Sequence, residues 1–372
     1  MTDDIPTTES AATIPGDALS CYTAAISRYL QKHRLDPVWI IGSQFYLAVA
    51  DNAADRPDFE FVHYHTPLLG AGSLAGARLE RRSAPDARRA AAAILADFRD
   101  SGPVIVSGDT FRLPWQVSCG VRHAPHWFVV DDVAADGNAV HVSDAFAYTD
   151  DEGDQAPHAG WHSLDDLASF ASISADRSGP LRSREIWALG TAERDDPESP
   201  HQWLATIVAP AACRFDAGSV GALFATSLDF ATGRVRRADL SGPHWHVGPD
   251  ALRHLHQRFI EFLAEPALYD FANDLWVAAR TRELFARTLA RAEREFGFAA
   301  AGTLATRLAD DIVPLWNTLP QLLRYNLACL ERGRKPRQLL ADTLGRIADA
   351  ETVFIRQFAE GLGAKAPLAE VS

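Results

Sequence analysis

Short apolar runs separated by turn residues characterise the stretch between residues 59 and 145. Three of these runs, at 103–107, 126–130 and 139–143, have the length and composition of buried strands. Asp136, Gly137 and Asn138 separate the last two runs, and such residues favour the tight turn of a β-hairpin. The pattern therefore predicts that strand 126–130 pairs antiparallel with strand 139–143.

A helix with a cysteine in its first turn is predicted within residues 17–35. Its apolar side chains repeat at helical spacing: Tyr22, Ala25, Ile26, Tyr29 and Leu30. Either Asp17 or Ser20 fits the N-cap position, which places Cys21 among the first-turn amides. These amides and the helix dipole favour a thiolate there. In the alternative interpretation, Cys21 is a small buried side chain that packs the helix start.

The second half of the sequence follows a helical period from Pro249 onward. One stripe interrupted only by Arg282 comprises Phe271, Leu275, Ala278, Phe285, Leu289, Ala292 and Phe296. A second stripe comprises Leu339, Thr343, Ile347, Ala350, Phe354 and Phe358. Such stripes are typical of a helix-bundle core, and we expect four or five helices.

Polar segments containing Pro and Gly at residues 172–183 and 194–200 indicate a boundary between the two halves. The predicted organisation is a disordered tail at 1–14, a first domain at 15–185 and a mainly helical domain at 186–372. A helix is predicted at 86–99, a strand at 59–65, and a short helix capped by Ser163. The runs 38–42 and 203–208 fit either a strand or a helix.

The composition is that of a globular protein, with 47% hydrophobic and 23% charged residues among 372. A net charge of −13 disfavours nucleic acid and acidic membranes as partners. No apolar run is as long as a membrane span, and the acidic N-terminal residues do not resemble a signal peptide. Four cysteines stand far apart without a CxxC pair, so we expect reduced thiols in the cytoplasm: Cys21, Cys119, Cys213 and Cys329.

Three residues combine into a candidate nucleophilic site. Cys21 begins a helix, His126 begins a strand, and Asp144 ends the next strand. The start of one strand and the end of its antiparallel partner lie side by side, which brings His126 to Asp144. A cysteine nucleophile needs a base within hydrogen-bond reach, and the base needs a third group on its other ring nitrogen. The order of Cys on an early helix, then His and Asp on a later sheet, is the papain-like layout.

Four segments carry a resemblance to a known family: 20–24 (SCYTA), 104–115 (VIVSGDTFRLPW), 126–132 (HWFVVDD) and 142–144 (VSD). They resemble the N-terminal domain of the butirosin biosynthesis protein H family. The resemblance covers residues 15–180, and the helical remainder is similar to the domain that commonly follows. It implies an α+β fold: a papain-like cysteine-enzyme domain, in which the Cys helix packs on an antiparallel sheet, and then a mainly α-helical domain.

The resemblance implies acyl transfer from a carrier-protein thioester to an amine in antibiotic or other specialised-metabolite biosynthesis. Cys21 would form the acyl-enzyme, His126 would act as base and Asp144 would orient it. The implied partners are an acyl or peptidyl carrier protein and a small-molecule amine acceptor. No cofactor of the chain's own is implied, because phosphopantetheine arrives on the carrier. Asp109, Trp115 and Trp127 are the expected substrate-binding residues, although Asp109 also fits a strand-end aspartate that bonds local backbone.

The chain departs from the family pattern at two points. Asp131 and Asp132 stand where the family often has Gly after its histidine strand. No Gln precedes Cys21 at the place where papain-like enzymes carry an oxyanion donor. Gln44 is the substitute candidate, and the backbone amide of Cys21 is the other.

Two other function classes remain open at this point. A papain-like amidase, peptidase or thioesterase would use water in the second step, and a non-catalytic module would bind a carrier or peptide with Cys21 as a structural residue. Glycines at 70, 72 and 76 indicate a loop, and the His pairs at 63/65 and 244/246 lack the further ligands of a metal site. One basic cluster fits a solvated connection or a dock for an acidic carrier: Arg332, Arg334, Lys335 and Arg337. The sequence also allows a homo-oligomer.

Overall fold

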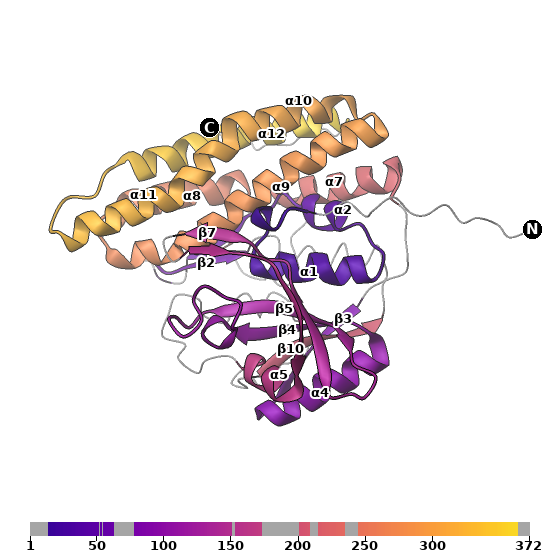
Figure 1. The fold of residues 1–372 in the computed structure, drawn as a ribbon. Coiled ribbons are helices and arrows are strands. Elements are labelled where there is room, and N and C mark those ends of the chain that lie inside the picture. Colours follow the sequence, from indigo (N-terminus) through magenta and orange to yellow (C-terminus); the bar gives the residue numbers. More distant parts are fainter. Residues whose placement is uncertain are drawn as a thin grey trace, which may run out of the picture. The chain divides into compact units, whose positions relative to one another are not determined.

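The computed structural model describes residues 14–51, 53, 55–62, 78–150, 153–172, 201–208, 215–234 and 245–363 (Figure 1). The chain forms two compact units. The first comprises Met1–Ile41 and Leu68–Arg214, and the second comprises Gly42–Pro67 and Phe215–Ser372. The fold is α+β, and the paired strands are antiparallel, in agreement with the coarse fold class predicted from the sequence.

A six-stranded antiparallel sheet forms the framework of the first unit. Its strands, in spatial order, are β3 (Arg78–Ala84), β10 (His201–Val208), β4 (Val104–Asp109), β5 (Pro125–Val133), β6 (Ala139–Asp144) and β9 (His158–Ser163). The central strand β4 is buried along its whole length, as its uninterrupted apolar run predicts. A separate two-stranded ribbon pairs β7 (Tyr148–Asp150) with β8 (Gly153–Gln155).

Helices cover both faces of this sheet (Figure 1). Helix α1 (Cys21–Lys32) packs on one face, where Tyr22 meets Trp127 of β5 edge to face with ring centroids 5.5 Å apart. Helices α4 (Ala87–Ser101) and α5 (Leu164–Phe170) pack on the other face, and Phe128 and Val130 belong to that core. Because side chains alternate along a strand, β5 supplies apolar contacts to both layers.

Most sequence predictions in the first unit are confirmed. The 126–130 and 139–143 runs form the predicted hairpin, and Ser163 caps α5 through a reciprocal capping box. The run at 203–208 is strand β10, because it pairs with β3 and β4. The run at 38–42 is helical, as α2 (Pro37–Gly42).

The second unit combines a small sheet with a set of helices. The antiparallel sheet has the order β11 (Trp245–Val247), β1 (Ala48–Asp51) and β2 (Phe59–Val62). Of these three strands, the sequence predicts only β2. The described helices are α7 (Ala217–Ala231), α8 (Pro249–Glu261), α9 (Ala272–Phe296), α10 (Ala299–Arg307), α11 (Val313–Glu331) and α12 (Leu339–Gly361). The 3₁₀ helix Pro266–Phe271 precedes α9, and a π-helical turn (Leu308–Ile312) joins α10 to α11. From Pro249 onward the described residues hold five α-helices, in agreement with the four or five expected, and α7 precedes them.

The two apolar stripes form the core of this unit. Phe285 of α9 and Phe354 and Phe358 of α12 are buried against one another. Arg282 interrupts the first stripe because it makes a buried ion pair with Glu351 of α12, at 2.8 Å from Nε to Oε1. The apparent break in the sequence pattern is therefore part of the core.

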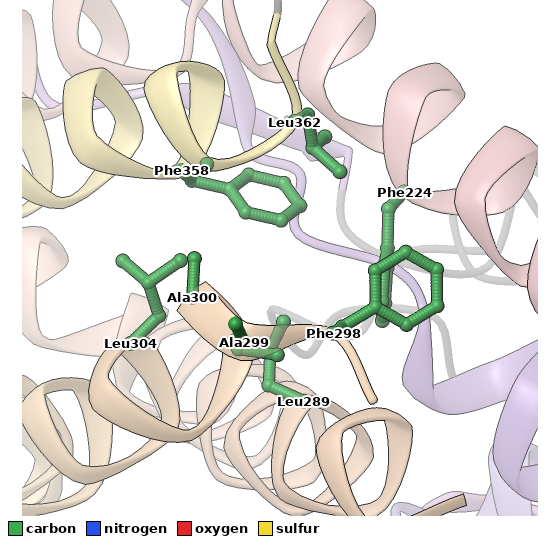
Figure 2. A pocket seen from close by; sticks show the side chains of 10 residues that line it. Phe224, Leu289, Phe298, Ala299, Ala300, Leu304, Phe358 and Leu362 are labelled. Carbon is green, nitrogen blue, oxygen red and sulfur yellow. The ribbon is translucent and has the colours of Figure 1, made fainter. Parts of the chain in front are cut away.

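A small apolar cavity of about 40 Å³ lies between α7, α9, α10 and α12. Figure 2 shows its lining, which includes Phe224, Leu289, Phe298 and Phe358. A space of this size has room for about one to three water molecules. We interpret it as a packing gap between the helices, without the converging polar groups of a ligand site.

The compact units differ from the predicted domain boundary near residue 185. Strand β10 belongs to the first unit because it lies between β3 and β4. Residues 42–67 belong to the second unit because β1 pairs with β11 and β2. Of the predicted tail, residues 1–13 lie outside the described residues, and Ile14 is buried.

Candidate active site

Cys21 occupies the first helical position of α1. Ser20 is the N-cap: its Oγ accepts from the Thr23 amide at 3.3 Å, and the Ser20 amide donates to Thr23 Oγ1 at 2.9 Å. This reciprocal capping box fixes the helix start as the sequence predicts. Cys21 is half-buried, and its own amide is one of the first-turn N–H groups that have no acceptor within the helix.

The β5–β6 hairpin brings His126 to Asp144. Val129 lies opposite Ser143 in its register. Extending this register by one residue would set Asp144 opposite Phe128 and make His126 its diagonal neighbour on the same face of the sheet. The His126 Nε2 atom lies 2.7 Å from Asp144 Oδ2, and both residues are buried. The neighbour relation predicted from the turn residues is therefore present.

Cys21 is close enough to His126 to influence the pKa of the same imidazole. Burial alone lowers the pKa of His126, but the Asp144 carboxylate and a hydrogen bond to Cys21 raise that pKa to about 10. Because Nε2 faces Asp144, Nδ1 is the ring nitrogen left for the thiol. At neutral pH the ring is a cation between two groups that favour its charge.

Asp144 receives three further hydrogen bonds. The Trp115 indole N–H donates to Oδ2 at 2.8 Å, the Gln116 side-chain amide donates to Oδ2 at 2.9 Å, and the Phe146 amide donates to Oδ1 at 3.0 Å. Gln116 Nε2 also lies 3.0 Å from His126 Nε2. Both carboxylate oxygens are thus fixed, which sets the direction in which Asp144 holds the imidazole.

Gln116 is a member of this site that the sequence reasoning missed. It directly follows the Leu113–Trp115 part of the segment that carries the family resemblance, so proximity to that motif is the one signal available. Its loop is held by Gln155 of β8, which accepts from the Val117 amide at 3.1 Å and donates to the Trp115 carbonyl at 3.2 Å. The β7–β8 ribbon therefore supports the residues that hold Asp144.

Asp131 joins the three elements that carry the candidate triad. It lies on β5, and its buried carboxylate accepts from Arg28 of α1 at 2.9 Å. On β6, His141 Nδ1 lies 2.6 Å from Oδ1 and Ser143 Oγ donates to Oδ2 at 2.8 Å. Lys32, one turn beyond Arg28, adds an ion pair at 3.2 Å. Although burial raises the pKa of Asp131, the bonds from His141, Ser143 and Arg28 outweigh burial and lower it.

Two histidines of β9 flank Trp115. The His158 ring stacks on the indole with centroids 4.5 Å apart, and His158 Nε2 lies 3.0 Å from His162 Nε2. Burial and the neighbouring imidazole lower the pKa of His158, and burial also lowers the pKa of His162. Both rings are therefore neutral at pH 7 and one donates a hydrogen bond to the other.

The remaining predicted binding residues have mainly structural contacts. Asp109 is buried and accepts a hydrogen bond from the Phe111 amide at 3.1 Å, which fits the alternative of a strand-end aspartate that bonds local backbone. Its carboxylate also lies 2.6 Å from His123 Nδ1. Trp127 is 1% exposed and packs on Tyr22 beneath α1. Trp115 is half-buried and hydrogen-bonded to Asp144. Substrate contacts by these residues stay a prediction.

Gln44 belongs to the second unit, whereas Cys21 belongs to the first. Its side-chain amide donates to Ser43 Oγ at 3.1 Å, and the residue is buried. A role of Gln44 as oxyanion donor therefore stays a prediction, as does the alternative donor, the backbone amide of Cys21 in the first unit.

Of the other cysteines, the two that the structure describes, Cys119 and Cys329, show no hydrogen bond to a basic side chain. Cys119 is exposed, with its sulfur 3.5 Å from the Phe111 carbonyl oxygen, and Cys329 is buried. Cys213 lies outside the described residues, as do His63, His65, His244 and the glycines at 70, 72 and 76.

Within the described ranges no three His, Cys, Asp or Glu side chains converge as metal ligands would. No helix of the described residues combines the length and hydrophobicity needed to cross a bilayer.

Comparison with protein-family models and with curated protein sequences gave no match for this chain. The family resemblance therefore stays a prediction that depends on the quoted segments. The observations that stand by themselves are the α+β fold, the capped helix that begins at Cys21, and the connected Cys21, His126 and Asp144 side chains.

Proposed function

We propose that this protein is a papain-like, cysteine-dependent acyltransferase that moves an acyl group from a carrier-protein thioester to an amine. The observation that carries the proposal is the chain of interactions from Cys21 through His126 to Asp144. A first-turn cysteine beside a buried imidazolium is the arrangement that stabilises a thiolate nucleophile. The resemblance to the butirosin biosynthesis protein H family supplies the substrate classes.

The first half-reaction forms an acyl-enzyme. The Cys21 thiolate attacks the thioester carbonyl carbon, forming a C–S bond, and in this proposal the Cys21 backbone amide donates to the developing oxyanion. Collapse of the tetrahedral intermediate breaks the bond to the phosphopantetheine sulfur. That leaving thiolate takes the proton from the His126 imidazolium, so His126 becomes neutral. Asp144 holds the ring in one orientation during this transfer.

The second half-reaction uses the neutral His126 as a base. An amine attacks the acyl-Cys21 carbonyl, gives one proton to His126, and the collapsing intermediate expels the Cys21 thiolate. The products are an amide and the original thiolate–imidazolium pair. Water in place of the amine would give a free acid, so the second nucleophile separates a transferase from a hydrolase.

Thiol labelling tests the nucleophile. Iodoacetamide at substoichiometric ratio, followed by intact-mass and peptide analysis, should modify Cys21 before Cys119, Cys213 and Cys329. The variant C21A should lose acyl-enzyme formation, while C119A should retain it. Equal labelling of all four thiols together with an active C21A variant would contradict a catalytic Cys21 and favour the non-catalytic binding module.

The reaction type is tested with an acyl N-acetylcysteamine thioester, a small substitute for the carrier-bound donor. We expect a covalent acyl adduct on Cys21 in the absence of amine, and amide product when a panel of primary amines is added. Free acid as the main product with and without amine would assign the protein to the hydrolase class instead.

A further inference from the structure

The connection between α11 and α12 carries a compact group of cations that the candidate active site does not use. Within six positions it holds Arg332, Arg334, Lys335 and Arg337, in a chain whose net charge is −13. All four side chains are exposed. We call these four residues the cationic loop.

The backbone of the cationic loop is fixed. Gly333, at φ +64°, ends α11 with its amide bonded to the Leu330 carbonyl at 2.9 Å, and the Arg334 amide bonds the Cys329 carbonyl at 2.8 Å. Asn326, which is 1% exposed, accepts from the Arg337 amide at 2.9 Å and donates to the Arg337 carbonyl at 3.0 Å. A buried side chain thus holds both polar groups of one loop residue.

The cations of this loop make no ion pair with a carboxylate of the part of the chain that the structure describes. Among the described residues, no Asp or Glu lies within ion-pair distance of any cationic-loop side chain. This differs from the arginines of α9, where Arg287 and Arg291 pair with glutamates one turn away. Four unneutralised cations on a fixed loop repel one another, and that repulsion is relieved when an anionic partner binds.

Two exposed apolar side chains border the cationic loop. Tyr325 is 44% exposed and lies under the Arg337 guanidinium, 4.8 Å from ring centroid to Cζ, and Leu339 is 46% exposed. Apolar groups ringed by cations suit a protein partner that brings carboxylates and a few apolar side chains. A nucleic acid is disfavoured, because the rest of this acidic chain would repel its phosphates.

We propose that the cationic loop, with Tyr325 and Leu339, is the docking surface for an acidic carrier protein. This inference rests on the proposed function, which requires such a partner, and it names the surface that recognises it. The carrier contributes carboxylates to the four cations, and its apolar side chains cover Tyr325 and Leu339. Docking raises the local concentration of the carrier-borne thioester at the enzyme.

The test compares binding and turnover in charge-reversal variants. The probe is the fluorescently labelled holo-acyl carrier protein of the source organism, titrated with R334E/K335E and with the matched control R294E/R356E, which reverses two exposed arginines on α9 and α12. We expect roughly tenfold weaker binding for R334E/K335E and less than about twofold weaker binding for the control. Both variants carry the same change in net charge, so a difference between them reports the position of the reversed charges. Raising NaCl from 50 to 500 mM should weaken wild-type binding far more than binding by R334E/K335E.

A second readout separates this inference from the proposed function. In R334E/K335E, kcat/KM for the carrier-borne thioester should fall about tenfold relative to kcat/KM for the N-acetylcysteamine thioester. If the wild type transfers acyl groups from the small thioester but the ratio does not change, the docking proposal is wrong and the acyltransferase proposal stands. If Cys21 accepts no acyl group from either donor while charge-dependent carrier binding persists, the acyltransferase proposal fails alone.

Two further outcomes would also overturn the docking proposal. Equal carrier binding by the wild type and R334E/K335E, including no binding by either, excludes the cationic loop as the carrier surface. Tight binding of a 20-nucleotide RNA that is lost in R334E/K335E, with carrier binding unchanged, would assign the loop to nucleic acid instead.

Discussion

Two buried carboxylates, Asp131 in the first unit and Glu351 in the second, have similar partners but different surroundings. Both side chains are inaccessible to solvent, and each binds an arginine. Glu351 accepts two bonds from Arg282 and one from Trp316, all inside the helical core. The partners of Asp131 come from α1 and β6, and Arg28 and Lys32 are each about a third exposed.

The difference lies in what each carboxylate connects. Glu351 joins α12 to α9 and α11 among aromatic rings, and the Arg282 guanidinium lies 4.8 Å from the ring centroids of Phe45 and Trp316. Asp131 joins the helix that begins at Cys21 to the two strands that carry His126 and Asp144. We therefore expect loss of Glu351 to reduce stability, and loss of Asp131 to reduce reactivity at Cys21 as well.

The largest effect is expected for E351Q. It leaves the buried Arg282 cation without its counterion, and breaking such a pair costs about 3–5 kcal/mol. Urea unfolding followed by far-UV circular dichroism measures the loss. The matched control is E283Q, which breaks the exposed Arg287–Glu283 pair and should cost less than about 0.5 kcal/mol. A loss below about 1 kcal/mol for E351Q would contradict the assigned role.

A sharper test on the first unit is D144N. The neutral amide removes the charge that keeps the His126 imidazolium protonated, so the pKa of His126 should fall. We expect iodoacetamide labelling of Cys21 at pH 7 to slow about 100-fold, the lower end of acid–base effects. Cys119 in the same sample is the internal control, and D154N, at an exposed β8 position, is the control variant. Unchanged labelling of Cys21 would remove Asp144 from the site.

The variant D131N tests the comparison itself. It removes the anion shared by Arg28, Lys32 and His141, so α1 is no longer tied by charge to β5 and β6. A displacement of about 1 Å between reacting groups costs up to 100-fold in rate, and we expect labelling of Cys21 to slow about tenfold. Stability should fall by about 1–3 kcal/mol. The control K32M removes only the ion pair of the one-third-exposed Lys32 and should change neither the labelling rate nor the stability by much.

A purely structural Asp131 would lower stability without changing the ratio of Cys21 to Cys119 labelling at temperatures where D131N is fully folded. That outcome would make the two buried carboxylates equivalent. Conversely, if E351Q slowed Cys21 labelling as much as D131N, the distinction between the units would be wrong.

The sequence predicted the local elements of the site better than the connections between distant segments. The N-cap at Ser20, one of the two candidates, and the turn at Asp136–Asn138 depend on neighbouring residues, and both are present. The pairing of His126 with Asp144 followed from the hairpin alone. By contrast, the insertion of β10 between β3 and β4 and the β1–β11 pairing join segments far apart in the chain. Periodicity carries no information about such partners.

Polar side chains illustrate the same limit. Gln116 and Asp131 give no periodic signal, and their roles depend on which strands become neighbours. Arg282 was visible as a break in an apolar stripe, but its partner Glu351 lies on a different helix. An interruption of a pattern marks a residue of interest without naming its counterpart.

The pH dependence of stability follows from the raised pKa of His126. Because the pKa of His126 is raised from its ordinary value of 6.5 to about 10 in the folded state, protonated His126 stabilises the fold. That contribution is fully present below about pH 6.5, decreases as the pH rises, and is gone above about pH 10. The difference in unfolding free energy between the wild type and H126Q should shrink across this window. A difference that grows with pH would show that His126 is neutral in the folded protein.

The smallest effect is expected for W115F, which keeps an aromatic ring against His158 but removes the indole N–H that donates to Asp144. Loss of one bond to a carboxylate that keeps the Gln116 and Phe146 donors costs about 1 kcal/mol, or about fivefold in Cys21 labelling. The control is W161F, an exposed β9 tryptophan that packs edge-on against His141 and makes no bond to Asp144. Because Asp144 stays charged in W115F, the loss should be far smaller than in D144N. An equal loss in the two variants would mean that the indole, rather than the charge of Asp144, is what orients His126.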